Sequence, residues 1–161
     1  MARVAVNPQI VSVPSPQGLP LVKYTAEDSK TWKKGELAYF TSGTITPVAG
    51  TGVTNVFGIM AQTQSTSTSS TEVWVLELIE GTRLYMFVMT NGSAATADTA
   101  EIGTAYGVEA LNNVTYLDTG TANGQFKVVR AGSDAMSLRD SYADMDSAPG
   151  LVLVEFQGYV S

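Results

Sequence analysis

Short runs in which apolar and polar residues alternate, separated by glycine or Asn-Gly turns, make up most of the chain. Val and Thr are frequent in these runs, and both favour strands because their branched Cβ atoms suit an extended backbone. The runs predict about eight to ten short strands with a turn every 8–12 residues or so. This spacing is typical of an all-β fold, here a single compact β-barrel or sandwich.

Several elements can be placed from the pattern. "EVWVLELIEGTRLYMFVM" (72–89) predicts a central hairpin that turns at Glu80-Gly81 and is apolar on both faces. Gly58, inside an apolar run, indicates a bulge or a close approach of two backbones. "SAATADTAEIG" (93–103) favours at most one short helix. Further strands are expected in "ELAYFT" (36–41), "AYGVEALNNVTYLDTG" (105–120), "GQFKVVRAG" (124–132) and "LVLVEFQGYV" (151–160).

The first 22 residues differ from the rest. They contain strand-like patches at residues 3–6 and 9–13, interrupted by four prolines at positions 8, 14, 16 and 20. Proline cannot donate to a sheet ladder, so we expect an extended N-terminal arm at residues 1–22 and a β-barrel domain at 23–161. The alternative is that residues 1–13 form an ordinary edge strand of the chain's own barrel.

Charge is distributed unevenly along the chain. Residues 1–34 carry five basic and two acidic side chains, a net +3, whereas the remainder carries four basic and 13 acidic side chains, a net −9. An acidic body repels phosphate backbones, so we expect no nucleic-acid partner. The basic leader could instead seek an acidic protein surface. No apolar run is long enough to cross a membrane, and the first residues lack a signal-peptide pattern, so we expect synthesis in a cytoplasm and no membrane partner.

Candidate chemistry is sparse. The chain contains no histidine and no cysteine, which removes His-based nucleophile systems and the usual zinc ligands. A glycosidase-like pair at Glu77 and Glu80 is better explained as a turn, and a Ser-Lys dyad would need a buried lysine. We therefore expect no enzyme, no catalytic residue, no cofactor and no metal. A solvated acidic loop is favoured over a calcium site for the cluster Asp134, Asp140, Asp144 and Asp146.

Two other features could face a ligand. The tract "TQSTSTSST" (63–71) has no aliphatic residue, and we interpret it as a mobile solvent loop, with a glycan-binding array as the sharper alternative. Most aromatic residues lie in apolar strand runs, where core packing explains them. Trp32 is the exception because polar residues flank it, so it could cap a barrel end or contact a partner.

From about Trp32 onward, the order of motifs resembles small β-barrel capsid decoration (cement) proteins of tailed bacteriophages. The resemblance covers roughly three quarters of the chain. It is carried by "WKKGELAYF", "VFGIMAQ", "EIGTAYGVEALNNVTYLDTG", "GQFKVVRA" and "GLVLVEF".

The resemblance implies a structural virion protein that binds the exterior of an assembled capsid as a homotrimer, with N-terminal arms on the major capsid protein. In this interpretation the arm adds a strand to an exposed edge of the shell. The expected contact residues are Arg3, Val4, Val6, Ile10, Val11, Val13 and Trp32. The alternative is a head-fibre or tail-associated β-module that binds host glycan, and the weakest candidate is a small hydrolase.

Overall fold

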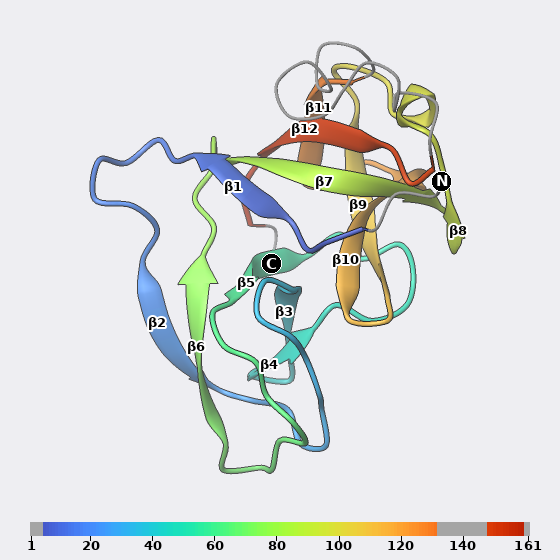
Figure 1. The fold of residues 1–161 in the computed structure, drawn as a ribbon. Coiled ribbons are helices and arrows are strands. Elements are labelled where there is room, and N and C mark those ends of the chain that lie inside the picture. Colours follow the sequence, from blue (N-terminus) through green and yellow to red (C-terminus); the bar gives the residue numbers. More distant parts are fainter. Residues whose placement is uncertain (1–4, 132–147, 160–161) are drawn as a thin grey trace.

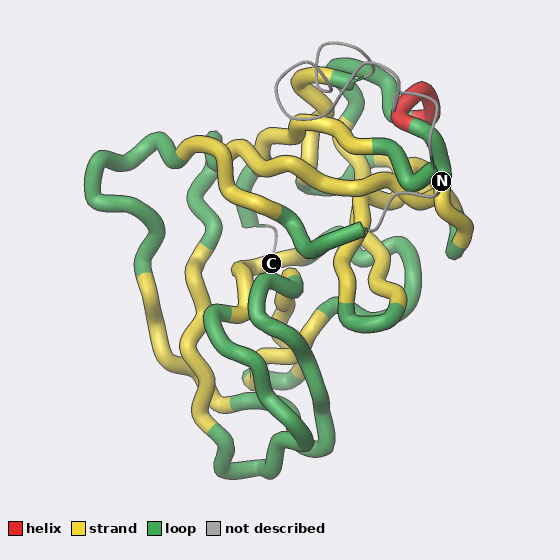
Figure 2. Tube along the Cα trace, viewed as in Figure 1, coloured by secondary structure: helices red, strands yellow, loops and turns green. Residues whose placement is uncertain are grey.

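The chain folds into two packed β-sheets with one short 3₁₀ turn (Figures 1 and 2). The computed structural model describes residues 5–131 and 148–159, and these form twelve strands. The expectation of an all-β chain with at most one short helix is confirmed. The elements are β1 (Gln9–Ser12), β2 (Leu21–Thr25), β3 (Leu37–Thr41), β4 (Thr44–Pro47), β5 (Val56–Met60), β6 (Glu72–Glu77), β7 (Arg83–Thr90), β8 (Ser93–Ala94), η1 (Ala97–Thr99), β9 (Ala105–Leu111), β10 (Val114–Ala122), β11 (Phe126–Arg130) and β12 (Leu151–Phe156).

The first sheet closes into a five-stranded barrel, in the upper part of Figure 1. Its strands follow the order β7–β10–β9–β11–β12, and β12 pairs again with β7 to complete the ring. β7 and β10 run parallel, and the other neighbouring strands of the ring run antiparallel. β1 and β8 pair with β7 in addition. The interior is filled by buried side chains that include Leu84, Val108, Leu117, Phe126 and Phe156.

The second sheet is antiparallel and has the order β2–β6–β5–β3–β4. It curls strongly, because Ala26, directly after β2, forms a bridge with Ile45 in β4 at the far end of the sheet. The curled sheet encloses a second apolar cluster around Trp32, Met60 and Val73. Its other face contributes Leu37 and Ile59 to the barrel cluster. The two sheets therefore share one apolar interface.

Polar side chains also join the two sheets. The backbone N–H of Leu37 in β3 donates to the buried hydroxyl of Thr115 in β10, at 3.1 Å. The side-chain amide of Gln125 pairs with Val56 in β5 as a neighbouring strand would, because it donates to the carbonyl (2.9 Å) and accepts from the N–H. Such bonds satisfy buried backbone groups that would otherwise carry a desolvation cost.

The close approach expected at Gly58 is confirmed. A Cβ atom at this position would lie 2.5 Å from the carbonyl oxygen of Leu76 in the neighbouring strand β6. On the other side, the pairing of β3 with β5 slips by one residue between Ala38 and Tyr39. Glycine therefore lets β5 pack tightly between its two neighbours.

The expectation of a central hairpin at residues 72–89 is wrong. Both strands exist, but β6 belongs to the second sheet and β7 to the barrel. The link between them crosses from one sheet to the other, where the Leu78 N–H bonds to the Phe57 carbonyl and the Gly81 N–H to the Phe156 carbonyl. β7 is apolar on both faces because one face fills the barrel and the other packs in a third cluster with Tyr116.

The N-terminal segment pairs with its own chain. β1 runs antiparallel to β7 with Ile10 opposite Leu84, and β2 pairs with β6 along its whole length. The prolines flank the strands at positions 8, 14, 16 and 20 and do not interrupt them, so each strand keeps its donors. Within residues 1–22 the described strand residues are thus paired with β7 and β6, and the edge-strand alternative describes β1. The expected boundary at residue 22 falls inside β2.

Candidate interaction surface

One side chain anchors the start of the described chain. Asn7 accepts a hydrogen bond from the Thr115 N–H (2.8 Å) and donates one to the Asn113 carbonyl (3.1 Å). Its amide thus pairs with the free edge of β10 as a strand residue would. The next residue, Pro8, is buried. These contacts fix the direction in which the chain enters β1.

The strand β1 lies on the surface with all four residues exposed. Ile10 is 40% exposed and Val11 is 47% exposed, and Val6, just before the strand, is 39% exposed. β1 stands at the end of the strand order, so within the described part of the chain β7 is its sole partner strand. Three of the expected contact residues are therefore exposed in β1 or directly before it. Val13 is half-buried, and Arg3 and Val4 lie outside the described residues.

A surface groove of about 490 Å³ runs beside this segment. The N-terminal residues supply one wall, the turn at Lys33-Lys34-Gly35 supplies a second, and the β9–β10 turn supplies a third. Its apolar lining includes Ala5, Val6, Pro8 and Val114. Ala5 and Val114 also pack against the cluster outside the barrel, which supports this part of the groove from beneath.

Two lysines at the edge of the groove are held in place by their backbone. The Lys33 N–H donates to Glu36 Oε2 (2.6 Å), and the Lys34 N–H donates to Thr63 Oγ1 (3.0 Å). Both residues are exposed. Among the described residues, neither ammonium group takes part in an ion pair; the pairs found there are Lys23–Glu72, Lys30–Glu27 and Arg83–Glu155. The groove thus combines apolar walls with a positively charged rim.

Trp32 does not contribute to this surface. Its side chain is 0% exposed, and the indole N–H donates to the carbonyl of Gln62 at 2.8 Å. Its backbone pairs in both directions with Gln64. The expectation that Trp32 contacts a partner is therefore wrong. The polar residues on either side of it in the sequence are exposed, but the Trp32 side chain itself is buried.

The Ser/Thr tract is more closely attached than its composition indicates. Ser67 is 1% exposed, and its hydroxyl donates to the Glu27 carbonyl and accepts from the Lys30 N–H (2.9 Å). The interpretation of residues 63–71 as a wholly solvated loop is therefore wrong at Ser67. The tract lies against residues 27–34 and completes that side of the second sheet.

The two carboxylates singled out in the sequence, Glu77 and Glu80, lie in different surroundings. Glu77 accepts a hydrogen bond from the Tyr24 hydroxyl, and burial together with this carboxylate raises the pKa of Tyr24 to about 12. Glu80 is exposed in the following turn. In residues 5–131 and 148–159, no three acidic side chains gather as a metal site would require. The acidic cluster at residues 134–146 lies outside the described residues.

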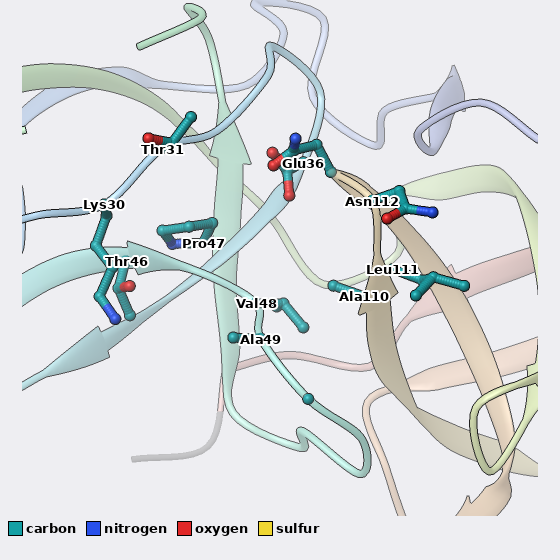
Figure 3. A pocket seen from close by; sticks show the side chains of 12 residues that line it. Lys30, Thr31, Glu36, Thr46, Pro47, Val48, Ala49, Ala110, Leu111 and Asn112 are labelled. Atoms are coloured by element: carbon teal, nitrogen blue, oxygen red, sulfur yellow. The ribbon is translucent and has the colours of Figure 1, made fainter. Parts of the chain in front are cut away.

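A smaller pocket of about 250 Å³ lies between the second sheet and the β9–β10 turn (Figure 3). Lys30, Thr46 and Pro47 lie on one side of it, and Leu111 and Asn112 lie on the other. The carboxylate of Glu36 also lines it, and burial raises the pKa of this group, although the Lys33 N–H and charge partly offset the rise. The lining thus mixes hydroxyl, amide and carboxylate groups.

Two buried acids lie on the outer face of the barrel. Glu109 in β9 is 1% exposed and Asp118 in β10 is 0% exposed. Asp118 accepts hydrogen bonds from the N–H groups of Gly52 (3.1 Å), Asn91 (3.3 Å) and Gly120 (2.9 Å), and from the Thr121 hydroxyl (2.9 Å). Glu109 Oε1 accepts from the Gly92 N–H at 2.8 Å. The pair therefore holds two turns, at Gly52 and at Asn91-Gly92, against the barrel, and Asp118 also binds the residues of β10 that follow it.

The two acids differ in protonation. Burial, and then the hydrogen bond and the charge of Asp118, raise the pKa of Glu109 to about 7. Burial also disfavours ionised Asp118, but the hydrogen bonds from Glu109 and its other donors outweigh this effect and lower its pKa. Within the described residues Glu109 Oε2 is buried and has no hydrogen-bond partner, so the neutral acid is less costly there than the carboxylate.

This arrangement predicts that stability falls as pH rises. Glu109 has its pKa raised from 4.5 to about 7 by folding, so its contribution is fully present below pH 4.5 and is lost as the pH rises to about 7. At 1.36 kcal/mol per pKa unit, the loss is on the order of 3 kcal/mol. Urea unfolding at pH 5 and pH 8 measures it as the difference between the wild type and Glu109→Gln, whose amide has a similar shape and does not titrate. Equal pH dependence in the two proteins would contradict the prediction.

Sequence reasoning missed Asn7, the groove and the acid pair. The signals in the sequence were weak, because neither a single Asn nor two acids nine residues apart form a recognisable motif. The two acids become neighbours only through the pairing of β9 with β10, which places Tyr116 opposite Glu109.

The described residues form no helix that is long and apolar enough to span a membrane. No protein-family model matches the chain, and no curated protein matches it.

Proposed function

We propose that this chain is a structural virion protein that binds the exterior of an assembled bacteriophage capsid and stabilises it. It acts as a homotrimer without catalysis, and its partner is the major capsid protein. The order of motifs from Trp32 onward supports this proposal, as does the exposed surface around β1. Binding only to the assembled shell would stabilise that shell by linkage.

The observation that carries the proposal is the exposure of β1. Ile10 and Val11 are apolar yet 40% and 47% exposed, on a strand at the end of its sheet. Exposed edges of this kind readily accept a further strand. Because Asn7 and β7 already hold the segment in an extended form, docking needs little additional ordering. The strand therefore acts as a preformed edge, and three copies would multiply a weak contact.

Co-sedimentation tests the proposal. The purified protein is pelleted with expanded capsids assembled from the major capsid protein of the same virus, and with its unassembled subunits. We expect it to pellet with capsids and to stay in the supernatant with subunits. Val11→Asp should weaken capsid binding by about tenfold or more, because a charge would be buried in the new strand pairing.

Leu111→Asp provides the matched control, since Leu111 is also 47% exposed but lies at the β9–β10 turn. It should pellet like the wild type. Wild-type protein that stays in the supernatant with expanded capsids would refute the proposal. Equal losses of capsid binding in Val11→Asp and Leu111→Asp would show that β1 has no specific role in binding.

The pocket in Figure 3 favours a second candidate, a head-fibre or tail-associated module that binds host glycan. Hydroxyl, amide and carboxylate groups such as Thr46, Asn112 and Glu36 suit a polyhydroxylated ligand. Trp32 takes no part in this candidate because it is buried. Binding to a glycan array without binding to capsids would favour the glycan-binding module over the capsid-binding protein.

A further inference from the structure

A rigid apolar knob projects from the turn before β9. Ile102 is 63% exposed, the highest value among the exposed large apolar side chains. The turn is closed by a hydrogen bond from the Thr104 N–H to the Glu101 carbonyl (3.2 Å), and Gly103 has φ of +90°, which suits the third position of a type II turn. The Gly103 N–H also bonds to the Val128 carbonyl at 2.8 Å. Ile102 is therefore held outward by a fixed backbone.

The groove described above lies at the other end of the same strand. The knob directly precedes β9 (Ala105–Leu111), and Asn113 and Val114 of the groove directly follow it. Seven strand residues span about 23 Å at roughly 3.3 Å per residue. The knob of one molecule therefore cannot reach its own groove, but it can reach the groove of a second copy.

The two surfaces are complementary in polarity and charge. The groove offers apolar contacts from Val6, Pro8 and Val114, and it carries the exposed side chains of Lys33 and Lys34 on its rim. The knob offers one branched apolar side chain, with the exposed carboxylate of Glu101 beside it. An apolar side chain that enters a pocket flanked by opposite charges is the usual form of a strong contact.

We propose that the chain self-associates head to tail, with Ile102 of one copy seated in the groove of the next and Glu101 facing Lys33 and Lys34. This inference deepens the proposed function, because it rests on the homotrimer stated there and names the surfaces that form it. A head-to-tail contact closes into a ring when its rotation allows. Each groove adjoins β1, so the contact would also fix the spacing of the three attachment strands.

Sedimentation velocity of the purified protein over a range of concentrations tests the contact without any capsid. We expect the wild type to form a concentration-dependent closed oligomer. Ile102→Ser and the double variant Lys33→Glu/Lys34→Glu should each raise the dissociation constant by about tenfold or more. Lys127→Glu, an exposed lysine on β11, is the matched control and should assemble like the wild type.

A charge exchange distinguishes a direct contact from a general charge effect. Adding Glu101→Lys to Lys33→Glu/Lys34→Glu should restore assembly, because the opposite charges again face each other. A monomeric wild type, or unchanged assembly of Ile102→Ser, would overturn the inference. Capsid pelleting of Ile102→Ser separates the two proposals: a variant that fails to assemble but still pellets would retain the proposed capsid binding and locate the failure in the self-association contact alone.

Discussion

Replacing Asp118 with alanine is expected to lower the free energy of unfolding by about 3–5 kcal/mol at neutral pH. The change leaves the N–H groups of Gly52, Asn91 and Gly120 without the fully buried carboxylate that accepts from them. It also leaves a cavity beside the buried side chain of Glu109. Urea unfolding, followed by the fluorescence of buried Trp32, measures the loss.

Two control variants separate this effect from a general loss of charge. Asp28→Ala removes an exposed acid and should change stability by less than about 0.5 kcal/mol. Thr121→Val removes one of the four donors and should cost about 1 kcal/mol. A cost for Asp118→Ala no larger than that for Thr121→Val would show that the turns at Gly52 and Asn91 do not depend on this carboxylate.

Replacing Trp32 with alanine should cost about 3–5 kcal/mol, as truncation of a fully buried large aromatic side chain does. The indole fills the centre of the second sheet with Ile45, Met60 and Val73, and its N–H satisfies the Gln62 carbonyl. The change leaves both a cavity and a buried acceptor without a partner. Far-UV circular dichroism during urea unfolding is the suitable measurement, since the fluorescent reporter is removed.

Trp74→Ala is the matched comparison. Trp74 is 43% exposed on β6, where Lys23 lies over its ring at 5.1 Å from the centroid, so its loss should cost no more than about 1 kcal/mol. Trp32→Ala that unfolds as readily as Trp74→Ala would contradict a structural role for Trp32. Because Trp32 has no exposed surface, Trp32→Phe should leave the proposed binding to capsids unchanged.

The local elements were predictable because each depends on nearby residues. The Asn112-Asn113 turn is an example, since both residues have positive φ (52° and 62°) and connect β9 with β10 as expected. The hairpin at 72–89 failed because a turn sequence such as Glu80-Gly81 does not specify which strands pair. Strands distant in the sequence decide the pairing: β6 pairs with β2 and β5, and β7 pairs with β12.

The candidate surface was predictable in part. Val6, Ile10 and Val11 are exposed in and beside a short edge strand whose limits the flanking prolines set, whereas their contact with a capsid stays a prediction. Its attachment to the chain was not predictable, since Asn7 meets Thr115 only after β10 is in place. Trp32 shows the opposite error. Its neighbours in the sequence are polar, which indicated an exposed residue, yet the side chains that pack around it in the structure are apolar.

Closure of the ring by β12 has a consequence for biosynthesis. Leu151 pairs with Phe87 and Val154 with Leu84, so β7 obtains this partner only when the last described strand has left the ribosome. Until then a nascent chain carries an incomplete sheet with an apolar open side, which is the form most prone to stick to other chains. Closure of the barrel is therefore expected to be slow for a chain of this size, as in other folds dominated by distant pairings.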